Sequence, residues 1–158
     1  MIRNPQLLEQ RRSEGRTEQP VAVVVSQSPD FSSAWRFFDQ PLQRWLLAPE
    51  PVDQGFDRWF PLAPTWPERL KALGAAGIQR LVLLGGAQLS ADLLQADCVD
   101  ALQLTLVPQL LGGRFSWLPC TDAPLPAALA QPGAWQSDGA EDLGDGEWLV
   151  RYRRIRSG

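Results

Sequence analysis

The hydrophobic pattern of the chain consists mainly of short runs of β-branched and aliphatic residues. Between some of these runs lie segments whose apolar residues recur with the period of a helix. The run Val21–Ser26 predicts a strand buried on both faces. Two further strands are predicted at Arg44–Ala48 and at Arg58–Leu62. Pro61 cannot donate to a neighbouring strand, so the third strand is expected at the edge of its sheet.

The next segment carries explicit signals for the start and the end of a helix. Thr65 and Glu68 have the spacing of a capping box, and Pro67 suits the first turn. Gly77 is well placed to end the helix in a left-handed conformation, with Ile78 packing back on the last turn.

A strand–helix–strand pattern follows. A hydrophobic strand is predicted at Arg80–Leu84, and it runs into Gly85-Gly86. A short helix is expected over Ser90–Asp97, with Ser90 as its N-cap. Alternating apolar and polar positions over Asp100–Pro108 then predict another strand.

The last part of the chain predicts a β-hairpin. A stretch rich in proline and glycine reaches Pro132, and strands are expected near Ala134–Ser137 and over Glu147–Ile155. Asp145-Gly146 between them is a strong hairpin signal. Together the patterns predict an α/β fold with a sheet of mixed strand direction, in a single domain over residues 1–158 whose residues 1–20 are a polar lead-in.

Composition excludes several classes of function. The 158 residues contain no histidine, which excludes a Ser-His-Asp triad, a Cys-His pair and a histidine-ligated zinc. A net charge of −3 does not support a nucleic-acid binder. The two cysteines, Cys98 and Cys120, cannot form a four-cysteine metal site, and a reducing cytoplasm is expected. The longest aliphatic run, Val21–Val25, is too short to span a membrane.

The strand, the two glycines and the helix over residues 81–89 form the most informative local motif. Two glycines let the backbone approach a ligand, and free N–H groups at the helix start favour a phosphate. A tight turn without a ligand explains the same residues equally well. For the basic end Arg151–Arg156, a solvated strand face is favoured over a phosphate contact. The acidic hairpin tip lacks the oxygen spacing of an EF-hand calcium loop.

The order of motifs over residues 79–114 resembles the RibD C-terminal reductase family. The matching elements are the strand with Gly85-Gly86, the short helix, Val99–Leu102, a strand ending at Pro108, and Leu110–Gly113. The resemblance implies a dihydrofolate-reductase-like α/β fold, with a mostly parallel sheet of mixed direction, flanking helices and a C-terminal hairpin.

The resemblance also implies a function, an NADPH-dependent reductase of riboflavin biosynthesis. Its substrate would be a pyrimidine ribosylamine phosphate, as for 5-amino-6-(5-phosphoribosylamino)uracil reductase. Matching positions for the cofactor are Ser26, Gly85, Gly86, Ala87 and Gln88. No catalytic residue and no metal ligand is assigned. A cytoplasmic homodimer is expected, with aromatic residues at its interface; the candidates are Trp135, Trp148 and Tyr152.

Two features depart from the family pattern. Leu84 stands at a position near the substrate that is often glutamate in the family. The family's first two strands have no counterpart, so the natural product is expected to carry an N-terminal extension or to be a degenerate relative. Two alternatives therefore stay open: a non-catalytic structural module, and a regulator that binds a nucleotide without chemistry.

Overall fold

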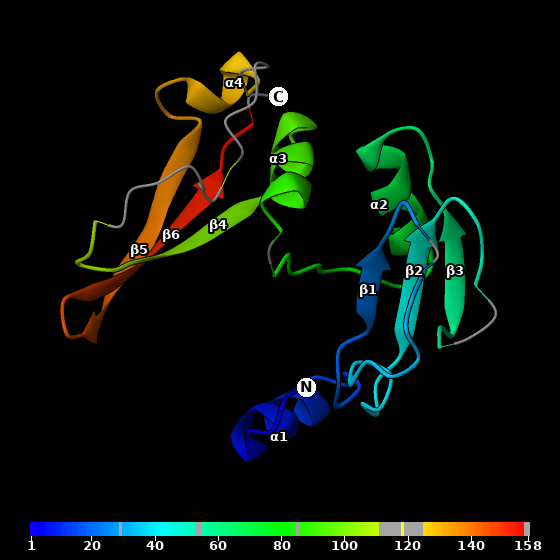
Figure 1. The fold of residues 1–158 in the computed structure, drawn as a ribbon. Coiled ribbons are helices and arrows are strands. Elements are labelled where there is room, and N and C mark those ends of the chain that lie inside the picture. Colours follow the sequence, from blue (N-terminus) through cyan, green and yellow to red (C-terminus); the bar gives the residue numbers. More distant parts are fainter. Residues whose placement is uncertain (29, 53–54, 85, 111–117, 119–124, 157–158) are drawn as a thin grey trace. The chain divides into compact units, whose positions relative to one another are not determined.

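A computed structural model describes residues 1–28, 30–52, 55–84, 86–110, 118 and 125–156. These residues fall into two compact units, Met1–Pro64 and Thr65–Gly158, which are drawn in Figure 1 and described here one at a time. Within the described ranges, no helix combines the length and the apolar character needed to cross a membrane.

The first unit is built on a parallel sheet of three strands. It contains helix α1 (Pro5–Ser13) and strands β1 (Ala22–Val25), β2 (Arg44–Ala48) and β3 (Arg58–Pro61). The strand order is β1-β2-β3 and both pairs are parallel, so β3 lies at an edge as Pro61 predicts. All three strands expected in this region are therefore confirmed.

The core of the first unit is centred on β2. Leu46, Leu47 and Ala48 are at most 1% exposed, and Trp45 is also buried. Every residue of β1 is only half-buried, which corrects the prediction of a strand buried on both faces. Among the described strands, β1 lies at the other edge of this sheet and pairs with β2 alone.

Arg44 at the start of β2 organises the preceding loop. Its guanidinium donates to the carbonyls of Phe37 (3.2 Å), Phe38 (2.7 Å) and Gln40, and it stacks on both phenylalanine rings. Its backbone N–H donates to the Asp57 carboxylate at 2.6 Å. One planar side chain thereby satisfies three loop carbonyls that helices or strands do not.

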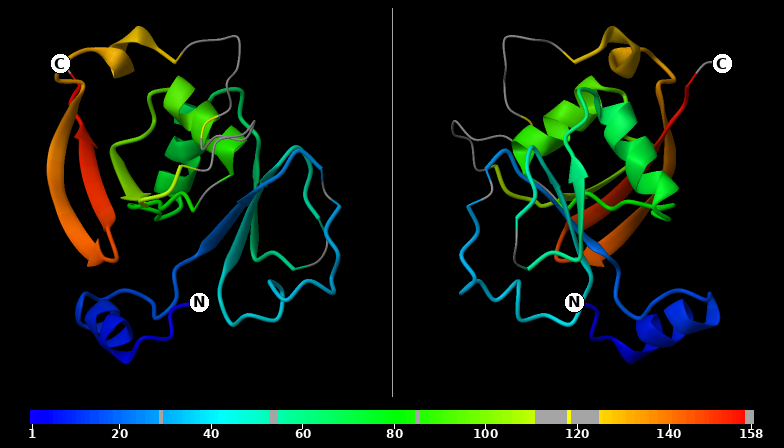
Figure 2. Two further views of the ribbon diagram at one scale, coloured as in Figure 1. Left: turned by 60° about the vertical axis from the view of Figure 1, so that its left-hand side comes forward. Right: turned by 90° about the vertical axis from the view of Figure 1, so that its right-hand side faces the viewer.

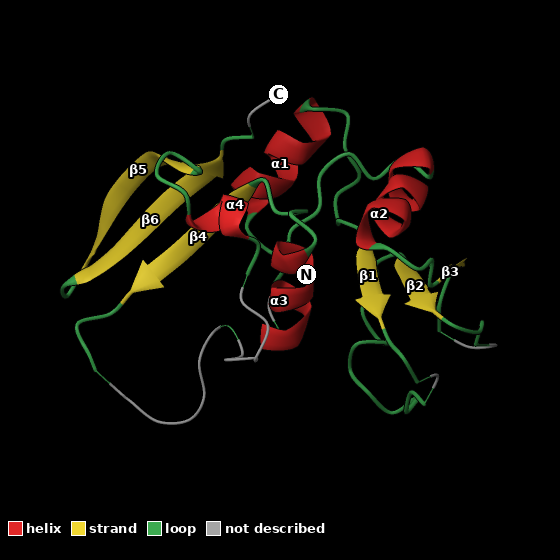
Figure 3. Cartoon of the chain, turned by 90° about the horizontal axis from the view of Figure 1, so that it is seen from above, coloured by secondary structure: helices red, strands yellow, loops and turns green. Residues whose placement is uncertain are grey.

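The second unit combines helices with an antiparallel sheet. Its helices are α2 (Trp66–Ala75), α3 (Ala87–Gln95) and α4 (Ala127–Ala130). Its strands are β4 (Ala101–Leu106), β5 (Trp135–Gly144) and β6 (Glu147–Arg154), in the order β4-β6-β5. Figure 2 shows β5 and β6 as a long hairpin, and Figure 3 shows the three strands side by side.

Local sequence signals are confirmed at both ends of α2. The Thr65 hydroxyl accepts from the Glu68 N–H, and the Glu68 carboxylate accepts from the Thr65 N–H, which completes the capping box. Gly77 has a φ of +106°, and the Ile78 N–H donates to the Leu73 carbonyl at 3.0 Å. This is the Schellman geometry that the glycine predicts.

The hairpin turn is also confirmed. Asp145 and Gly146 lie between β5 and β6 with φ values of +52° and +79°. Two consecutive residues of positive φ are the requirement of a type I′ turn, which matches the twist of the flanking strands. The β5 strand extends to Gly144, well beyond the expected Ser137, because two register shifts let it follow β6 along its whole length.

Two predictions for residues 80–97 are wrong. Arg80–Leu84 form no strand, and Leu81, Val82 and Leu84 are 45%, 77% and 95% exposed. The helix expected from Ser90 begins at Ala87, because the Gly86 carbonyl accepts the first helical hydrogen bond, from the Ser90 N–H at 2.9 Å. The Ser90 hydroxyl is therefore inside the helix and is not its cap.

Candidate functional site

The start of α3 presents backbone N–H groups that have no acceptor among the described residues. Gly86 is the N-cap residue and, having no side chain, offers no acceptor to the first turn. Among the described residues, no acceptor contacts the N–H groups of Ala87, Gln88 or Leu89. These donors lie at the positive end of the helix dipole, where an anionic oxygen is stabilised.

Gly86 is required by its backbone conformation. Its φ is +90° and its ψ is 104°, a region that residues with a side chain rarely adopt. A Cβ atom built on Gly86 would be 3.8 Å from the Leu89 Cβ, which is an ordinary contact. A Cβ atom at this position would therefore meet no clash among the described residues. The neighbouring Gly85 lies outside the described residues.

The other two candidates on α3 differ in what they can offer. The Gln88 side chain is exposed, and its Nε2 donates to the Asp92 Oδ1 at 2.9 Å along the helix. Ala87 is half-buried and has only its backbone N–H to contribute. The site on α3 therefore consists mainly of backbone N–H groups.

Ser26 follows the last residue of β1, at the carboxyl end of the parallel sheet. Its N–H donates to the Leu47 carbonyl at 3.0 Å. Its hydroxyl donates to the Ser28 carbonyl and accepts from the Ser28 N–H at 3.2 Å. The hydroxyl thus stabilises its own turn. Ser26 belongs to the first unit and Gly86–Gln88 to the second, so the structure describes these candidates in two separate groups.

Leu84 precedes the two glycines and is 95% exposed. Its side chain has no polar atom, so it offers a substrate only van der Waals contact. The arrangement at the α3 start can hold an anionic group, but Leu84 cannot donate or accept a proton.

The basic C-terminal residues are engaged in ion pairs, and one of them is buried. The Arg154 side chain is only 5% exposed, and it donates to both Asp97 carboxylate oxygens, at 2.9 and 3.1 Å. This hydrogen bond is the main reason that the pKa of Asp97 is lowered. Arg156 contacts the Asp100 Oδ1 at 2.6 Å, and Arg151 contacts the Glu141 Oε2 at 2.7 Å.

The prediction of a solvated strand face is therefore wrong for Arg154. In β6 the even-numbered residues from Trp148 to Arg154 share one face of the strand. On that face Val150 and Tyr152 are half-buried. The two-residue period of the strand does not mark this face as the inner one, because Trp148 on the same face is 46% exposed, and it does not identify Asp97 as the partner.

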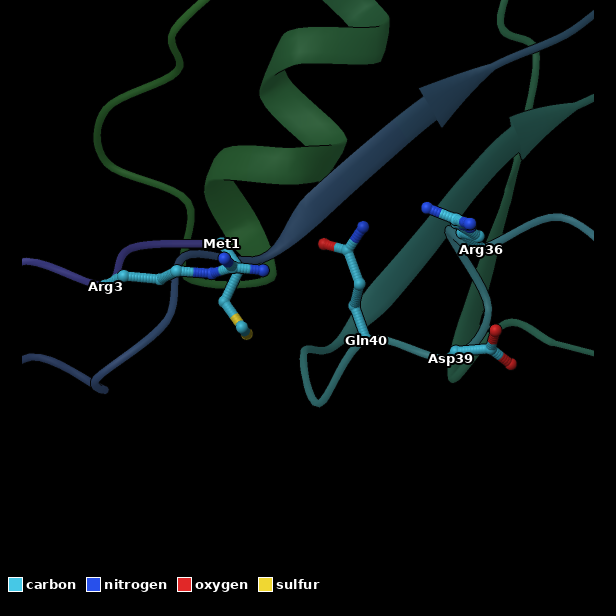
Figure 4. A pocket seen from close by; sticks show the side chains of 5 residues that line it. All are labelled: Met1, Arg3, Arg36, Asp39 and Gln40. Atoms are coloured by element: carbon cyan, nitrogen blue, oxygen red, sulfur yellow. The ribbon is translucent and has the colours of Figure 1, made fainter.

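Two other features do not contribute to this site. Burial raises the pKa of the Cys98 thiol, which keeps it protonated and a poor nucleophile. The first unit has an open pocket of about 420 Å³, and none of the predicted site residues lines it. Figure 4 shows the side chains that do. The pocket's lining residues are Met1, Arg3, Arg36, Asp39 and Gln40. Among the described residues, no group of three potential ligands could hold a metal ion.

Comparison with known proteins identifies the family to which the chain is similar. Residues 1–145 match the model of the family described as RibD C-terminal domain. The riboflavin biosynthesis protein RibD of Haemophilus influenzae is 31% identical over 133 residues, which are 80% of this chain and 35% of that protein. The chain thus spans about a third of the length of this relative.

Solved structures show the same fold. A pyrimidine reductase-like protein from Corynebacterium diphtheriae superposes with a TM-score of 0.79 at 19% identity, covering 99% of this chain and 70% of the other. A diaminohydroxyphosphoribosylaminopyrimidine deaminase/5-amino-6-(5-phosphoribosylamino)uracil reductase from Thermotoga maritima superposes with a TM-score of 0.66 at 17% identity. That match covers 86% of this chain and 38% of the other. The mixed α/β fold is therefore that of the dihydrofolate-reductase-like reductases, as expected.

Proposed function

The chain belongs to the RibD C-terminal domain family, a family of riboflavin biosynthesis reductases, and on that premise we propose that it is an NADPH-dependent reductase. The proposal treats residues 1–158 as one reductase domain. The substrate class is a pyrimidine ribosylamine phosphate, and the protein acts in the cytoplasm. The observation that carries the proposal is the α3 start, with Gly86 at a φ of +90° before three N–H groups that lack an acceptor among the described residues.

The residues at the α3 start fit the pyrophosphate of a dinucleotide. Gly86 presents no side chain at the turn, and the N–H groups of Ala87 and Gln88 would donate to phosphate oxygens. Gly85 is proposed for the same contact from its place in the sequence. Ser26 is proposed for the adenosine half from its place in the sequence, and its hydroxyl closes a turn with Ser28. When bound, NADPH supplies the hydride that reduces the sugar of the substrate.

The chain's own residues would bind and orient the reactants. Hydride transfer depends strongly on the alignment of donor and acceptor, which a histidine-free chain can provide. Leu84 would contact the substrate through its apolar side chain and would exclude water on that side. No side chain of the described site is assigned as an acid or a base.

Self-association is part of the proposal. Of the three aromatic residues expected at a dimer interface, Trp148 is 46% exposed, whereas Trp135 and Tyr152 are half-buried. Trp148 is therefore the aromatic residue best placed for an interface on the second unit's sheet.

The test of the cofactor site compares two glycines of similar backbone conformation. NADPH binding is measured by fluorescence in the natural chain, in Gly86→Ala and in Gly77→Ala. Both glycines have positive φ at a helix end. The space beside Gly77 is open, and a Cβ at Gly86 would make only an ordinary contact with Leu89. Because only Gly86 adjoins the proposed phosphate site, Gly86→Ala should weaken NADPH at least about tenfold, the loss of about 1.4 kcal/mol. Gly77→Ala should leave the affinity unchanged.

Equal NADPH affinity in the three proteins, with circular dichroism showing all of them folded, would refute the site. Turnover of NADPH with a pyrimidine ribosylamine phosphate tests the reductase itself. Binding without turnover would favour the second candidate, a non-catalytic nucleotide binder. Leu84 supports that candidate. It is exposed and apolar at the position proposed to lie near the substrate, where only a polar side chain could hydrogen-bond a sugar.

A further inference from the structure

The open pocket of the first unit brings together two arginines that have no partner of their own. Its lining residues come from two stretches of that unit, residues 1–3 and residues 36–40. In the part of the chain that the structure describes, the side chains of Arg3 and Arg36 make no hydrogen bond and no ion pair. By contrast, the guanidinium groups of Arg44 and Arg154 each bind several acceptors. The two pocket arginines thus have donors to offer to a ligand.

The side chains in the pocket are arranged around Gln40. Figure 4 shows the guanidinium groups of Arg3 and Arg36 directed toward Gln40 from opposite sides, whereas the carboxylate of Asp39 points away from it. Gln40 is half-buried, and its amide adds a neutral donor between the two cations. Two arginines and one aspartate give this lining a charge of +1, in a chain whose net charge is −3.

Hydrogen bonds hold the backbone on both sides of the pocket. On one side, the Gln19 side chain accepts from the Ile2 N–H at 2.8 Å and donates to the Ile2 carbonyl at 2.9 Å. On the other side, the Arg44 guanidinium donates to the carbonyls of Phe38 and Gln40. A ligand would therefore meet two arginines whose backbone is already in place, which lowers the entropic cost of binding.

We infer that this pocket binds a phosphate monoester between Arg3 and Arg36. The phosphate group has three terminal oxygens and a charge of about −1.5 to −2, so it can accept from both guanidinium groups at once and offset their charge. The Gln40 amide would donate to the third oxygen. A carboxylate has two oxygens in one plane and a single charge, which suits one guanidinium better than two on opposite sides.

The pocket lies apart from Ser26, the residue of the first unit that is proposed for the cofactor. Arg44 opens β2 and binds the Gln40 carbonyl, so Gln40 lies at the edge where the parallel strands begin. Ser26 follows β1, at the edge where the strands end. Phosphate binding in this pocket would therefore be an additional property of the chain, independent of NADPH binding.

The experiment is an NMR titration of the ¹⁵N-labelled chain with inorganic phosphate and with glycerol 3-phosphate, at constant low ionic strength. The natural chain should bind both with a dissociation constant of about 1 mM. Arg3→Gln and Arg36→Gln should each weaken binding about threefold or more, the size expected for a charge pair in contact with water. Asp39→Asn should strengthen binding, because it removes a like charge. Arg153→Gln, which removes an exposed arginine of the second unit, should leave the affinity unchanged.

The position of the shifted amides separates this pocket from the cofactor site. Shifts of Arg36 and Gln40 support the pocket, whereas shifts confined to the first turn of α3 would assign phosphate to that turn and overturn the inference. An affinity unchanged in Arg3→Gln and Arg36→Gln, with circular dichroism showing both folded, would overturn it as well. So would acetate binding as tightly as phosphate. None of these outcomes decides NADPH binding, which Gly86→Ala tests separately.

Discussion

Replacing Asp97 by asparagine should destabilise the second unit by removing the charge that holds Arg154. Asp97 has a φ of +49°, which asparagine tolerates about as well as aspartate, so the backbone conformation is kept. The Arg154 side chain is 5% exposed, and its two hydrogen bonds to Asp97 measure 2.9 and 3.1 Å. In the variant, the amide NH₂ would face a guanidinium N–H, and one of these bonds would be lost.

The size of the effect follows from the exposure of the two partners. A hydrogen bond to a charged group contributes about 1.5–3 kcal/mol, and breaking a fully buried pair costs about 3–5 kcal/mol. The Asp97 side chain is 33% exposed, so water compensates part of the loss. Arg154 also keeps its hydrogen bond to the Ala134 carbonyl at 3.0 Å. The expected loss in the free energy of unfolding is therefore about 2 kcal/mol at pH 7.

Urea denaturation followed by circular dichroism measures this loss, and a loss of this size shifts the midpoint by about 1 M. The matched control is Asp138→Asn. Asp138 pairs with Arg153 at 3.5 Å, and both side chains are more than half exposed. A pair of this kind contributes at most about 1 kcal/mol, so the control should shift the midpoint far less.

The effect should also depend on pH in a defined direction. Arg154 lowers the pKa of Asp97, so the folded state favours the charged carboxylate. The resulting stability is present above about pH 5 and is lost as the pH falls through about 4, the ordinary value, toward the lowered pKa. The natural chain and Asp97→Asn should therefore converge in acid. Equal midpoints at pH 7, or a difference that persists unchanged in acid, would refute the reasoning.

Two further predictions concern single local interactions. Gly55→Ala should destabilise the first unit by more than Gly133→Ala destabilises the second. A Cβ at Gly55 would overlap the Phe38 ring, whereas Gly133 has open space at a similar positive φ. Thermal unfolding of the two variants measures the difference, and equal shifts would contradict it. Thr65→Ala should cost about 1 kcal/mol through loss of the helix cap, whereas Thr65→Ser should restore most of it in urea denaturation. A stability equal to that of the natural chain in Thr65→Ala would show that the cap is dispensable.

The elements that the sequence predicts correctly are those fixed by neighbouring residues. The α2 helix begins at a capping box and ends at Gly77, and all of these residues lie within a few positions of one another. The β5–β6 turn depends on Asp145-Gly146 alone. The parallel strands β1 and β2 follow from aliphatic runs bounded by turn residues. Such signals act over a few residues and need no knowledge of the tertiary fold.

The start of α3 shows why a local signal can mislead. Ser90 is a favourable cap residue, but Gly86 can adopt a φ of +90° that starts the helix four residues earlier. The helix therefore begins directly after the glycines. Its first N–H groups, which have no acceptor among the described residues, lie at the motif that the sequence singles out. The observed start of α3 therefore supports the candidate site better than the predicted start does.

Arg154 and the segment that ends at Leu84 show two ways in which a sequence pattern fails to predict structure. Arginine is rarely buried, and nothing near Arg154 in the sequence announces Asp97, which lies 57 positions away. The segment Arg80–Leu84 has strong strand propensity, but a strand exists only where a second strand supplies its hydrogen bonds. Propensity describes what a segment can form, and the partner decides whether it forms. An aliphatic run that forms no strand among the described residues therefore shows where local propensity ends, because the hydrogen bonds of a strand come from residues far away in the sequence.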